Sequence, residues 1–212
     1  MVRIQTGNLK GQTLRTPKGR AIRPTTSYMR ERVFNIIGID RINGARFLDL
    51  CSGTGAMAFE AISRGAEYAY LVECDRDYCG YLHDNARKLD VEDKLRVACI
   101  KYQQAPRLLV RNPKLDKYFN IVYFDPPYNK VTPLQLINEL QGIIVIVAND
   151  ALIFIESITH AFELTLPITV GNFTCVDERH TGNSQITIWQ VSESARTAPK
   201  LNMQIDNEEE LS

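Results

Sequence analysis

Between residues 46 and 156 of this 212-residue chain, short apolar runs alternate with segments of helical periodicity. Such alternation is typical of an α/β protein with a parallel, doubly wound sheet. Two later apolar runs have no long helix between them, which predicts an antiparallel addition at one edge of the sheet. The expected strands are Arg46–Cys51, Ala69–Glu73, Leu95–Ile100, Ile121–Phe124, Ala151–Glu156, Phe162–Val170 and Gln185–Val191, and the expected helices between the first five are Ala56–Ser63, Arg76–Leu89, Ala105–Val110 and Pro133–Leu140.

The segment that precedes this alternation has a different character. Short extended pieces among glycines and a proline predict a small hairpin, and a helix is expected from about Ser27 to Ile37, with threonines available as caps and Gly38 at its end. Residues 1–46 hold ten basic and two acidic residues, a charge of +8, although the whole chain has a net charge of zero. The asymmetry favours a polyanionic partner, although a solvated basic face would produce the same pattern.

Three regions follow from these patterns. Residues 1–45 form a basic N-terminal extension of hairpin and helix, residues 46–191 form the α/β domain, and residues 192–212 form an acidic tail that we expect to be mobile because it is poor in apolar residues. The chain is 44% hydrophobic, enough for a sizeable core. Its longest apolar run, Gly142–Val147, is of strand length and far below the roughly 20 residues of a membrane helix.

The cysteines and the N-terminus indicate the compartment. Five cysteines are scattered without a CxxC pair or a nearby histidine cluster, so neither a disulfide framework nor a metal site is expected. Free thiols fit a reducing cytoplasm. The first residues carry charges and glycines instead of an apolar signal core. We therefore expect a cytoplasmic protein without a membrane segment, and nothing in the sequence demands more than a monomer.

A glycine loop joins the first expected strand to the first helix of the domain. In the stretch from Asp49 to Ala56, Gly53 and Gly55 would let backbone N–H groups approach a ligand at a helix start. Cys51 and Ser52 lie in the same loop and are candidate contacts. Taken alone the motif is weak, because glycine turns join strands to helices in many α/β proteins.

Two acidic residues indicate which ligand this loop would bind. Glu73 ends the second strand twenty residues after Gly53, where an acid accepts hydrogen bonds from a ribose, with Cys74 beside it. Asp49 would repel a pyrophosphate and attract a cation. S-adenosylmethionine has a cationic amino group and sulfonium and no phosphate, so the pattern favours this cofactor over NAD. The alternative is a plain turn with a solvated Glu73.

The fourth strand runs directly into Asp125-Pro126-Pro127-Tyr128. Two prolines cannot continue a sheet, so they predict a rigid loop at the carboxyl end of the strand, where open α/β sheets bind ligands. The carboxylate of Asp125 and the carbonyl of Pro126 can accept the two N–H groups of an exocyclic base nitrogen and aim its lone pair at a methyl group. Tyr128 can stack on the base. The structural alternative is a Pro-Pro turn with Asp125 as a helix cap.

Taken together, these motifs resemble the bacterial 16S rRNA guanine-N2 methyltransferases over about Arg3 to Val191. The resemblance implies a seven-stranded Rossmann-like methyltransferase sheet with an N-terminal extension, and methylation of a guanine N2 in 16S rRNA or the assembling 30S subunit. The matching residues are Gly7, Gly11, Pro17 and Gly19, then Arg23 to Thr26, Arg30-Glu31, Phe34-Asn35, Asp49 to Gly55, Glu60 to Ala66, Glu73 and Asp125 to Tyr128.

Several further site residues are implied by this resemblance alone. Thr26 and Arg30 are expected near the cofactor, and Arg20, Arg23 and Thr25 are expected to contact the RNA in addition to Tyr128. Gln104 stands where many methyltransferases place an acid beside the adenine. The segment 142–149 lacks the usual Pro-Gly turn before the fifth strand, so its geometry is expected to differ.

Three other functions fit part of the pattern. A DNA adenine or cytosine amino-methyltransferase shares the Asp-Pro-Pro-Tyr chemistry, but the chain has no room for a separate target-recognition domain. A protein glutamine methyltransferase would be expected to have asparagine in place of Asp125. A non-catalytic RNA-binding protein would have no need for Asp49, Glu73 and Asp125. Methylation at C5 needs a cysteine nucleophile, and the chain has no Pro-Cys step.

Overall fold

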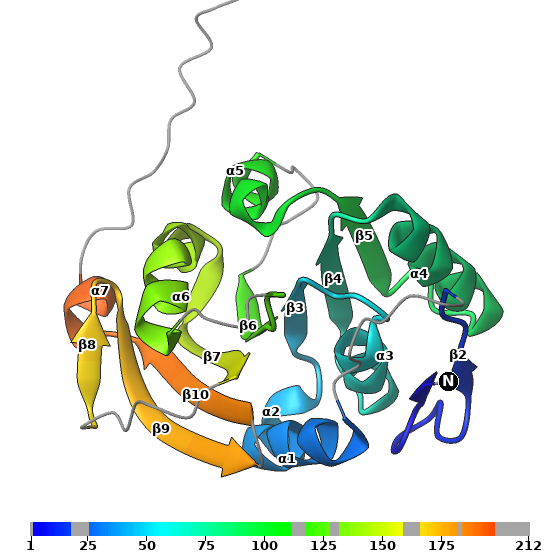
Figure 1. Ribbon diagram of the computed structural model, residues 1–212, viewed down its shortest axis with the longest axis horizontal. Helices are drawn as coiled ribbons and strands as arrows, with labels where there is room; N and C mark the ends of the chain where they lie inside the picture. Colours follow the sequence, from blue (N-terminus) through cyan, green and yellow to red (C-terminus); the bar gives the residue numbers. More distant parts are fainter. Residues whose placement is uncertain are drawn as a thin grey trace, which may run out of the picture.

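The computed structural model describes residues 2–17, 26–111, 118–127, 132–158, 166–181 and 184–197. Its centre is an eight-stranded sheet with the order β5-β4-β3-β6-β7-β10-β9-β8 (Figure 1). The strands are β3 (Arg46–Leu50), β4 (Tyr68–Glu73), β5 (Leu95–Cys99), β6 (Phe119–Phe124), β7 (Val147–Ile158), β8 (Ile168–Val170), β9 (Phe173–Thr181) and β10 (Ser184–Val191). A separate two-stranded sheet pairs β1 (Val2–Arg3) with β2 (Thr13–Leu14).

Five strands of the large sheet are parallel and three are antiparallel. β3 lies between β4 and β6 and pairs in parallel with both, so the strand order reverses there. Such a reversal is a topological switch point, where open α/β sheets bind their ligands. β10 pairs antiparallel with β7 and β9, and β8 with β9. The α/β fold class, with an antiparallel addition at one edge, is therefore as the sequence predicts.

Helices cover both faces of the sheet because successive strand residues point to opposite sides. In β3, Phe47 belongs to one hydrophobic core and Leu48 to the other. The first core is closed by α1, α3 and α4, and the second by α5, α6 and the 3-10 segment η2. The helices are α1 (Ser27–Ile37), α2 (Ile39–Ile42), α3 (Ala56–Ser63), α4 (Arg76–Lys88), α5 (Ala105–Val110), α6 (Pro133–Glu139) and α7 (Glu193–Thr197), with 3-10 turns η1 (Tyr102–Gln104) and η2 (Gln141–Val145).

The helix expected from Ser27 to Ile37 is confirmed as α1. Thr26 is its N-cap, accepting a hydrogen bond from the N–H of Met29 at 3.2 Å, and Gly38 ends it with a φ of 76°. A positive φ of this kind favours glycine, which explains the position of the helix end. The N-terminal hairpin is also confirmed, with Val2 opposite Leu14.

Two details differ from the expected strands. The described sheet has eight strands instead of seven because β9 was not anticipated. Its second half, Asp177 to His180, is charged and masks the strand pattern, whereas pairing with β10 supplies the backbone hydrogen bonds. The apolar run Gly142–Val147 lies mostly in η2, and β7 begins only at Val147. The expected strand 162–170 is described only from residue 166, and its strand is β8.

The N-terminal extension shares the core of the α/β domain. Val2, Ile4 and Leu14 are buried in the first hydrophobic core. The carboxylate of Glu60, on α3, is fully buried and accepts hydrogen bonds from the N–H groups of Gln5 at 2.8 Å and Thr6 at 3.0 Å. These bonds fix the extension to the domain by main-chain contacts.

Gly7 is required by this docking. Its φ is +83°, and a Cβ atom there would lie 1.7 Å from the carbonyl oxygen of Ser63. The N–H of Asn8 donates to the same carbonyl at 2.8 Å, and the N–H of Leu9 donates to the Ser63 hydroxyl at 2.9 Å. The end of α3 and the N-terminal loop therefore pack backbone against backbone. The motifs Gly7 to Gly11 and Glu60 to Ala66 belong to this structural contact.

The described fold continues past Val191, where the sequence suggested a tail. The N–H of Ser192 donates to the carbonyl of Asn172 at 2.8 Å, and α7 follows directly. Residues 198–212, which hold most of the acidic tail, lie outside the described residues. Within the described part of the chain, no helix has the length and apolar character needed to cross a bilayer.

Candidate active site

Three strands deliver their next residues to one edge of the sheet. Leu50 of β3 is in register with Val72 of β4 and with Phe124 of β6. One step further, Cys51 leaves the sheet after β3. It has Glu73, the last residue of β4, on one side and Asp125, which follows β6, on the other. Sequence positions 51, 73 and 125 meet because parallel neighbours end at the same edge.

The glycine loop is held against the neighbouring strand. The N–H of Gly53 donates to Glu73 Oε2 at 2.7 Å, and the N–H of Ser52 donates to the carbonyl of Val72 at 2.9 Å. The Ser52 hydroxyl donates to the Asp49 carbonyl at 2.8 Å. Ser52 is thus occupied by the main chain and shapes the loop.

Gly55 is needed for packing as well as for its backbone conformation. Its φ is +74°, and a Cβ there would lie 2.5 Å from a methyl carbon of Leu82 and 2.9 Å from the ring of Phe59. Gly55 therefore lets α3 and α4 approach each other behind the loop. Cys51 also has a positive φ, 63°, which is uncommon for a residue with a side chain. Strained backbone of this kind often marks a functional loop.

The carboxylate of Glu73 is buried and organises the start of α4. Besides Gly53, it accepts hydrogen bonds through Oε1 from the N–H groups of Cys74 at 2.8 Å and Asp75 at 2.9 Å. A carboxylate has about four lone-pair sites, so capacity for a further donor remains. The Asp75 side chain caps α4 by accepting from the N–H of Asp77.

Asp49 is the most deeply enclosed acid of the edge. Its side-chain oxygen Oδ2 is buried and has no hydrogen-bond partner among the described residues. Burial raises the pKa of this carboxyl well above its usual range; the N–H of Ala58 opposes the shift, and the charges of Asp125 and Glu73 add to it. An unpaired buried carboxyl oxygen facing two more acids is a position for a cationic group.

The thiol of Cys51 experiences the same field. Burial raises its pKa first, and the charges of Glu73, Asp49 and Asp125 raise it further. Cys51 therefore stays a neutral thiol and is a poor nucleophile. This agrees with the exclusion of C5 methylation, which depends on a thiolate.

The expected catalytic loop follows β6. Asp125 is half-buried, Pro126 is buried and Pro127 is exposed. Phe124, the residue before this loop, packs against Tyr102 with ring centroids 4.8 Å apart. This contact holds the end of β6, from which the loop begins. Tyr102 is a supporting residue that the sequence did not single out, since one aromatic at the start of a 3-10 turn gives no distinctive signal. Tyr128 lies outside the described residues.

The remaining expected contacts that the structure describes lie in α1, in η1 and beside Glu73. Arg30 is buried in α1 and donates to the carbonyl of Arg3 at 3.0 Å, and burial lowers the pKa of its guanidinium. Gln104 is exposed and accepts from the N–H of Lys101 at 3.2 Å, closing the η1 turn. Cys74 is exposed beside Glu73. Three expected contacts lie outside the described residues, namely Arg20, Arg23 and Thr25.

A reversed strand order, a glycine loop and a buried acidic edge are the arrangement expected of an S-adenosylmethionine-dependent methyltransferase fold. A solved structure titled "Putative methyltransferase yhhF from Escherichia coli" aligns over 90% of this chain and 97% of its own, with a TM-score of 0.70 and 30% identity. The fold class and the cofactor class inferred from the sequence are thus confirmed.

The chain belongs to the family described as "Conserved hypothetical protein 95", whose model matches residues 2–190. It is 32% identical over 191 residues to the "Ribosomal RNA small subunit methyltransferase D" of Escherichia coli (strain K12), covering 89% of each chain. It is also 31% identical over 192 residues to the "Putative rRNA methyltransferase YlbH" of Bacillus subtilis (strain 168), covering 89% of this chain and 98% of the relative. The resemblance to rRNA methyltransferases is confirmed.

Proposed function

We propose that this protein transfers a methyl group from S-adenosylmethionine to the exocyclic N2 of a guanine in 16S rRNA. The observation that carries the proposal is the strand register, in which Glu73 of β4 and Asp125 after β6 flank the start of the glycine loop at one edge of the sheet. The acid proposed to bind the ribose and the acid proposed to bind the base then lie on either side of that loop. The choice of rRNA rests on the relatives, whose names specify ribosomal RNA.

The acidic edge fits the cofactor. Glu73, with capacity for one further donor, would accept a hydrogen bond from a ribose hydroxyl. Asp49, with its unpartnered buried oxygen, would attract the positively charged groups of the cofactor. When bound, the cofactor supplies an electrophilic methyl group on a positively charged sulfur. We retain Thr26, Arg30, Cys74 and Gln104 as further proposed contacts.

Asp125 and the carbonyl of Pro126 would bind and orient the amino group of the base. By accepting the two N–H groups of the guanine amine, they would hold the nitrogen with its lone pair aimed at the methyl carbon. The methyl group would pass to the nitrogen while the electron pair of the carbon–sulfur bond stays with the donor's sulfur. The methylated nitrogen would then be acidic, and Asp125 would take its proton. This chemistry needs positioning and electrostatic stabilisation more than a strong base.

The substrate is tested by methyl transfer from labelled cofactor to naked 16S rRNA, assembled 30S subunits and duplex DNA, followed by nucleoside analysis. Label in N2-methylguanine of rRNA is expected. Label in N6-methyladenine of DNA would instead identify a DNA amino-methyltransferase. Absence of transfer to every substrate, combined with no detectable heat on titration with S-adenosylhomocysteine, would favour a non-catalytic RNA-binding protein.

Asp125→Ala separates catalysis from folding. We expect methyl transfer to fall by about 100- to 1000-fold, because an oriented acceptor at the reacting nitrogen is lost. Calorimetric affinity for S-adenosylhomocysteine should remain within a few-fold of the wild type. Asp177→Ala, a half-buried acid in the middle of β9, serves as a control far along the sheet order. Loss of cofactor binding together with transfer would show that Asp125 is structural.

A further inference from the structure

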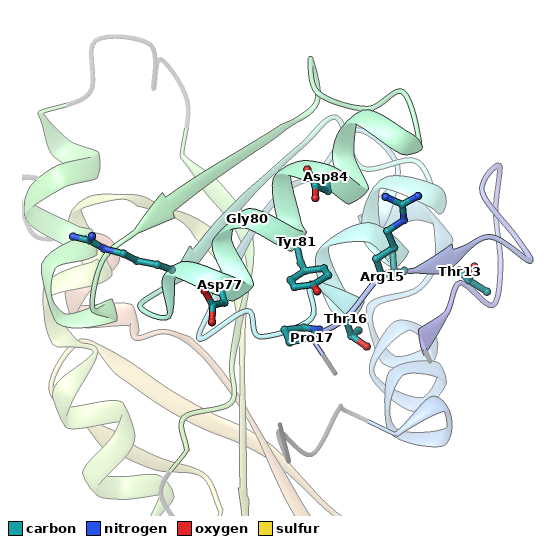
Figure 2. Close-up of a pocket in the computed structure, with 10 residues that line it drawn as sticks. Thr13, Arg15, Thr16, Pro17, Asp77, Gly80, Tyr81 and Asp84 are labelled. Atoms are coloured by element: carbon teal, nitrogen blue, oxygen red, sulfur yellow. The ribbon is translucent and has the colours of Figure 1, made fainter. Parts of the chain in front are cut away.

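A groove of about 1000 Å³ lies between the segment that follows β2 and helix α4 (Figure 2). It is separate from the acidic edge but begins next to it, because the N–H of Asp75, one residue before α4, donates to Glu73. Neither the glycine loop nor Asp125 lines it. The lining residues are Thr13, Leu14, Arg15, Thr16, Pro17, Arg76, Asp77, Gly80, Tyr81 and Asp84.

One wall of the groove is fixed by a buried asparagine. Asn85, which is 0% exposed, accepts from the N–H of Arg15 at 2.8 Å and donates from Nδ2 to the Arg15 carbonyl at 2.9 Å. Lys88 Nζ donates to the carbonyl of Thr13 at 2.6 Å. The main chain of Arg15 is therefore pinned to α4, while its side chain is exposed and borders the groove (Figure 2). Such a wall is preorganised for a ligand.

Gly80 opens the floor of the groove on α4. It is exposed in the middle of the helix, its φ is not positive, and an added Cβ would meet nothing within 4 Å. A glycine in a helix interior costs about 1 kcal/mol relative to alanine. Neither packing nor backbone conformation within the described protein requires it. Close approach of a flat ligand to the helix would explain this residue.

The side chains around Gly80 suit a nucleotide. Tyr81 presents an aromatic ring in the centre of the groove (Figure 2), and a base can stack on such a ring. Arg15 and Arg76 offer positive charge for phosphates, whereas Asp77 can accept hydrogen bonds from base amino groups. A polyanion without bases would gain nothing from the acidic residues. A nucleotide, which combines an anionic phosphate with N–H donors, matches both.

We propose that this groove binds a nucleotide of single-stranded RNA that flanks the target base. The proposal rests on the proposed function and adds a second contact point for the same strand. The groove starts beside Glu73, so a strand whose target base enters the acidic edge can continue along α4 between Tyr81 and Arg15. RNA loops expose unstacked bases of this kind, which aromatic side chains bind.

Two variants test the groove in opposite ways. Tyr81→Ala should raise KM for the rRNA substrate about tenfold by removing the stacking surface. Gly80→Leu should fill the groove and raise KM similarly, while its melting temperature stays equal or rises because leucine is a better helix former. Arg15→Ala should reduce the salt dependence of RNA binding by about one unit of slope. His83→Ala, exposed on the same helix but outside the groove, is the matched control.

The readouts distinguish this inference from the proposed function. If the wild type methylates rRNA and neither Tyr81→Ala nor Gly80→Leu changes KM for RNA by more than twofold, the groove proposal is overturned. Equal losses in affinity for S-adenosylhomocysteine and RNA would assign the groove to the cofactor and also overturn it. If the wild type modifies no RNA, the proposed function fails. Filter binding of a labelled rRNA hairpin to wild type, Gly80→Leu and His83→Ala then tests the groove independently, and equal affinities would overturn it.

Discussion

Glu60 and Glu73 are both buried glutamates that accept hydrogen bonds from main-chain N–H groups, yet they lie in opposite surroundings. Glu60 is fully enclosed between α3 and the N-terminal loop, and Arg64 Nε donates to it at 2.9 Å. Glu73 lies at the carboxyl edge and keeps 7% of its surface exposed. Burial raises the pKa of neighbouring Asp49 most, and the charges of Asp125 and Glu73 add to the shift.

The difference is that the partners of Glu60 are all supplied by the folded protein, whereas the edge around Glu73 has excess negative charge that a ligand could neutralise. At Glu60 the protein itself supplies two N–H donors and a cation, so the carboxylate is satisfied in the folded chain. At the Glu73 edge, negative charges converge around an unpaired oxygen of Asp49, which costs stability until a cation arrives. Both residues belong to motifs that resemble one family, but only Glu73 lies at the edge proposed to bind a ligand. The comparison also explains why Gly7 and Ser63 match that family: they hold the N-terminal loop against α3 and do not lie at the proposed site.

The largest effect should follow Glu60→Ala. Removing this carboxylate leaves buried N–H groups and Arg64 without their acceptor, so the free energy of unfolding should fall by about 3–5 kcal/mol. Urea denaturation measures it. Glu60→Gln, which retains one acceptor oxygen, should lose clearly less. If Glu60→Ala lowered cofactor affinity per folded molecule while stability stayed unchanged, the distinction between the two glutamates would be wrong.

Glu73→Ala should act mainly on binding. We expect affinity for S-adenosylhomocysteine to fall about 100-fold, equivalent to about 2.7 kcal/mol, because a charged acceptor for a ribose hydroxyl is lost and the loop that it holds is loosened. Calorimetric titration gives this value directly. The Glu73→Gln variant should keep part of the affinity because its amide oxygen still accepts. An unaltered affinity in Glu73→Ala would remove this residue from the cofactor site.

Asp49→Asn should have the smallest effect, and one that depends on pH. Because burial raises the pKa of Asp49 in the folded state, its contribution to stability is greatest below the unfolded pKa, about 3.9, and is lost as pH rises toward the folded pKa. Asparagine does not ionise, so the variant should not lose stability in this way. Between acidic and neutral pH, the free energy of unfolding of ligand-free Asp49→Asn should therefore rise by about 1 kcal/mol relative to that of the wild type.

Cofactor binding should show the reverse dependence on Asp49. A bound cation favours the ionised carboxylate, so wild-type affinity for S-adenosylhomocysteine should decrease as pH falls through the folded pKa of Asp49. Binding just below that pKa should release protons, because the ligand-free carboxyl is still protonated there. The Asn variant should lack this component. Thermal melting and titration over a pH series measure both trends. A stability difference that does not vary with pH would mean that Asp49 does not carry the charge argued here.

The periodic elements of the domain could be predicted because each is encoded locally. Apolar strands such as Arg46–Leu50 and capped helices such as Ser27–Ile37 follow from residue pattern and end signals. β9 could not be predicted, because its charged residues are typical of a loop. Only the pairing with β10 in the folded protein makes this segment a strand. The docking role of Glu60 was equally hidden, because an acid within a helix gives no sign of the loop that will reach it.

The site shows the same division. The sequence by itself determined the glycine loop, Glu73, Asp125 and the two prolines, since chemistry restricts which residue types can do these tasks. Only the tertiary structure decided that positions 51, 73 and 125 share one edge, that Ser52 is occupied by main-chain carbonyls, and that Arg15 is pinned beside Tyr81. The physical reason is that residue types are set locally, whereas burial, register and the field of neighbouring charges depend on strands and helices distant in the chain.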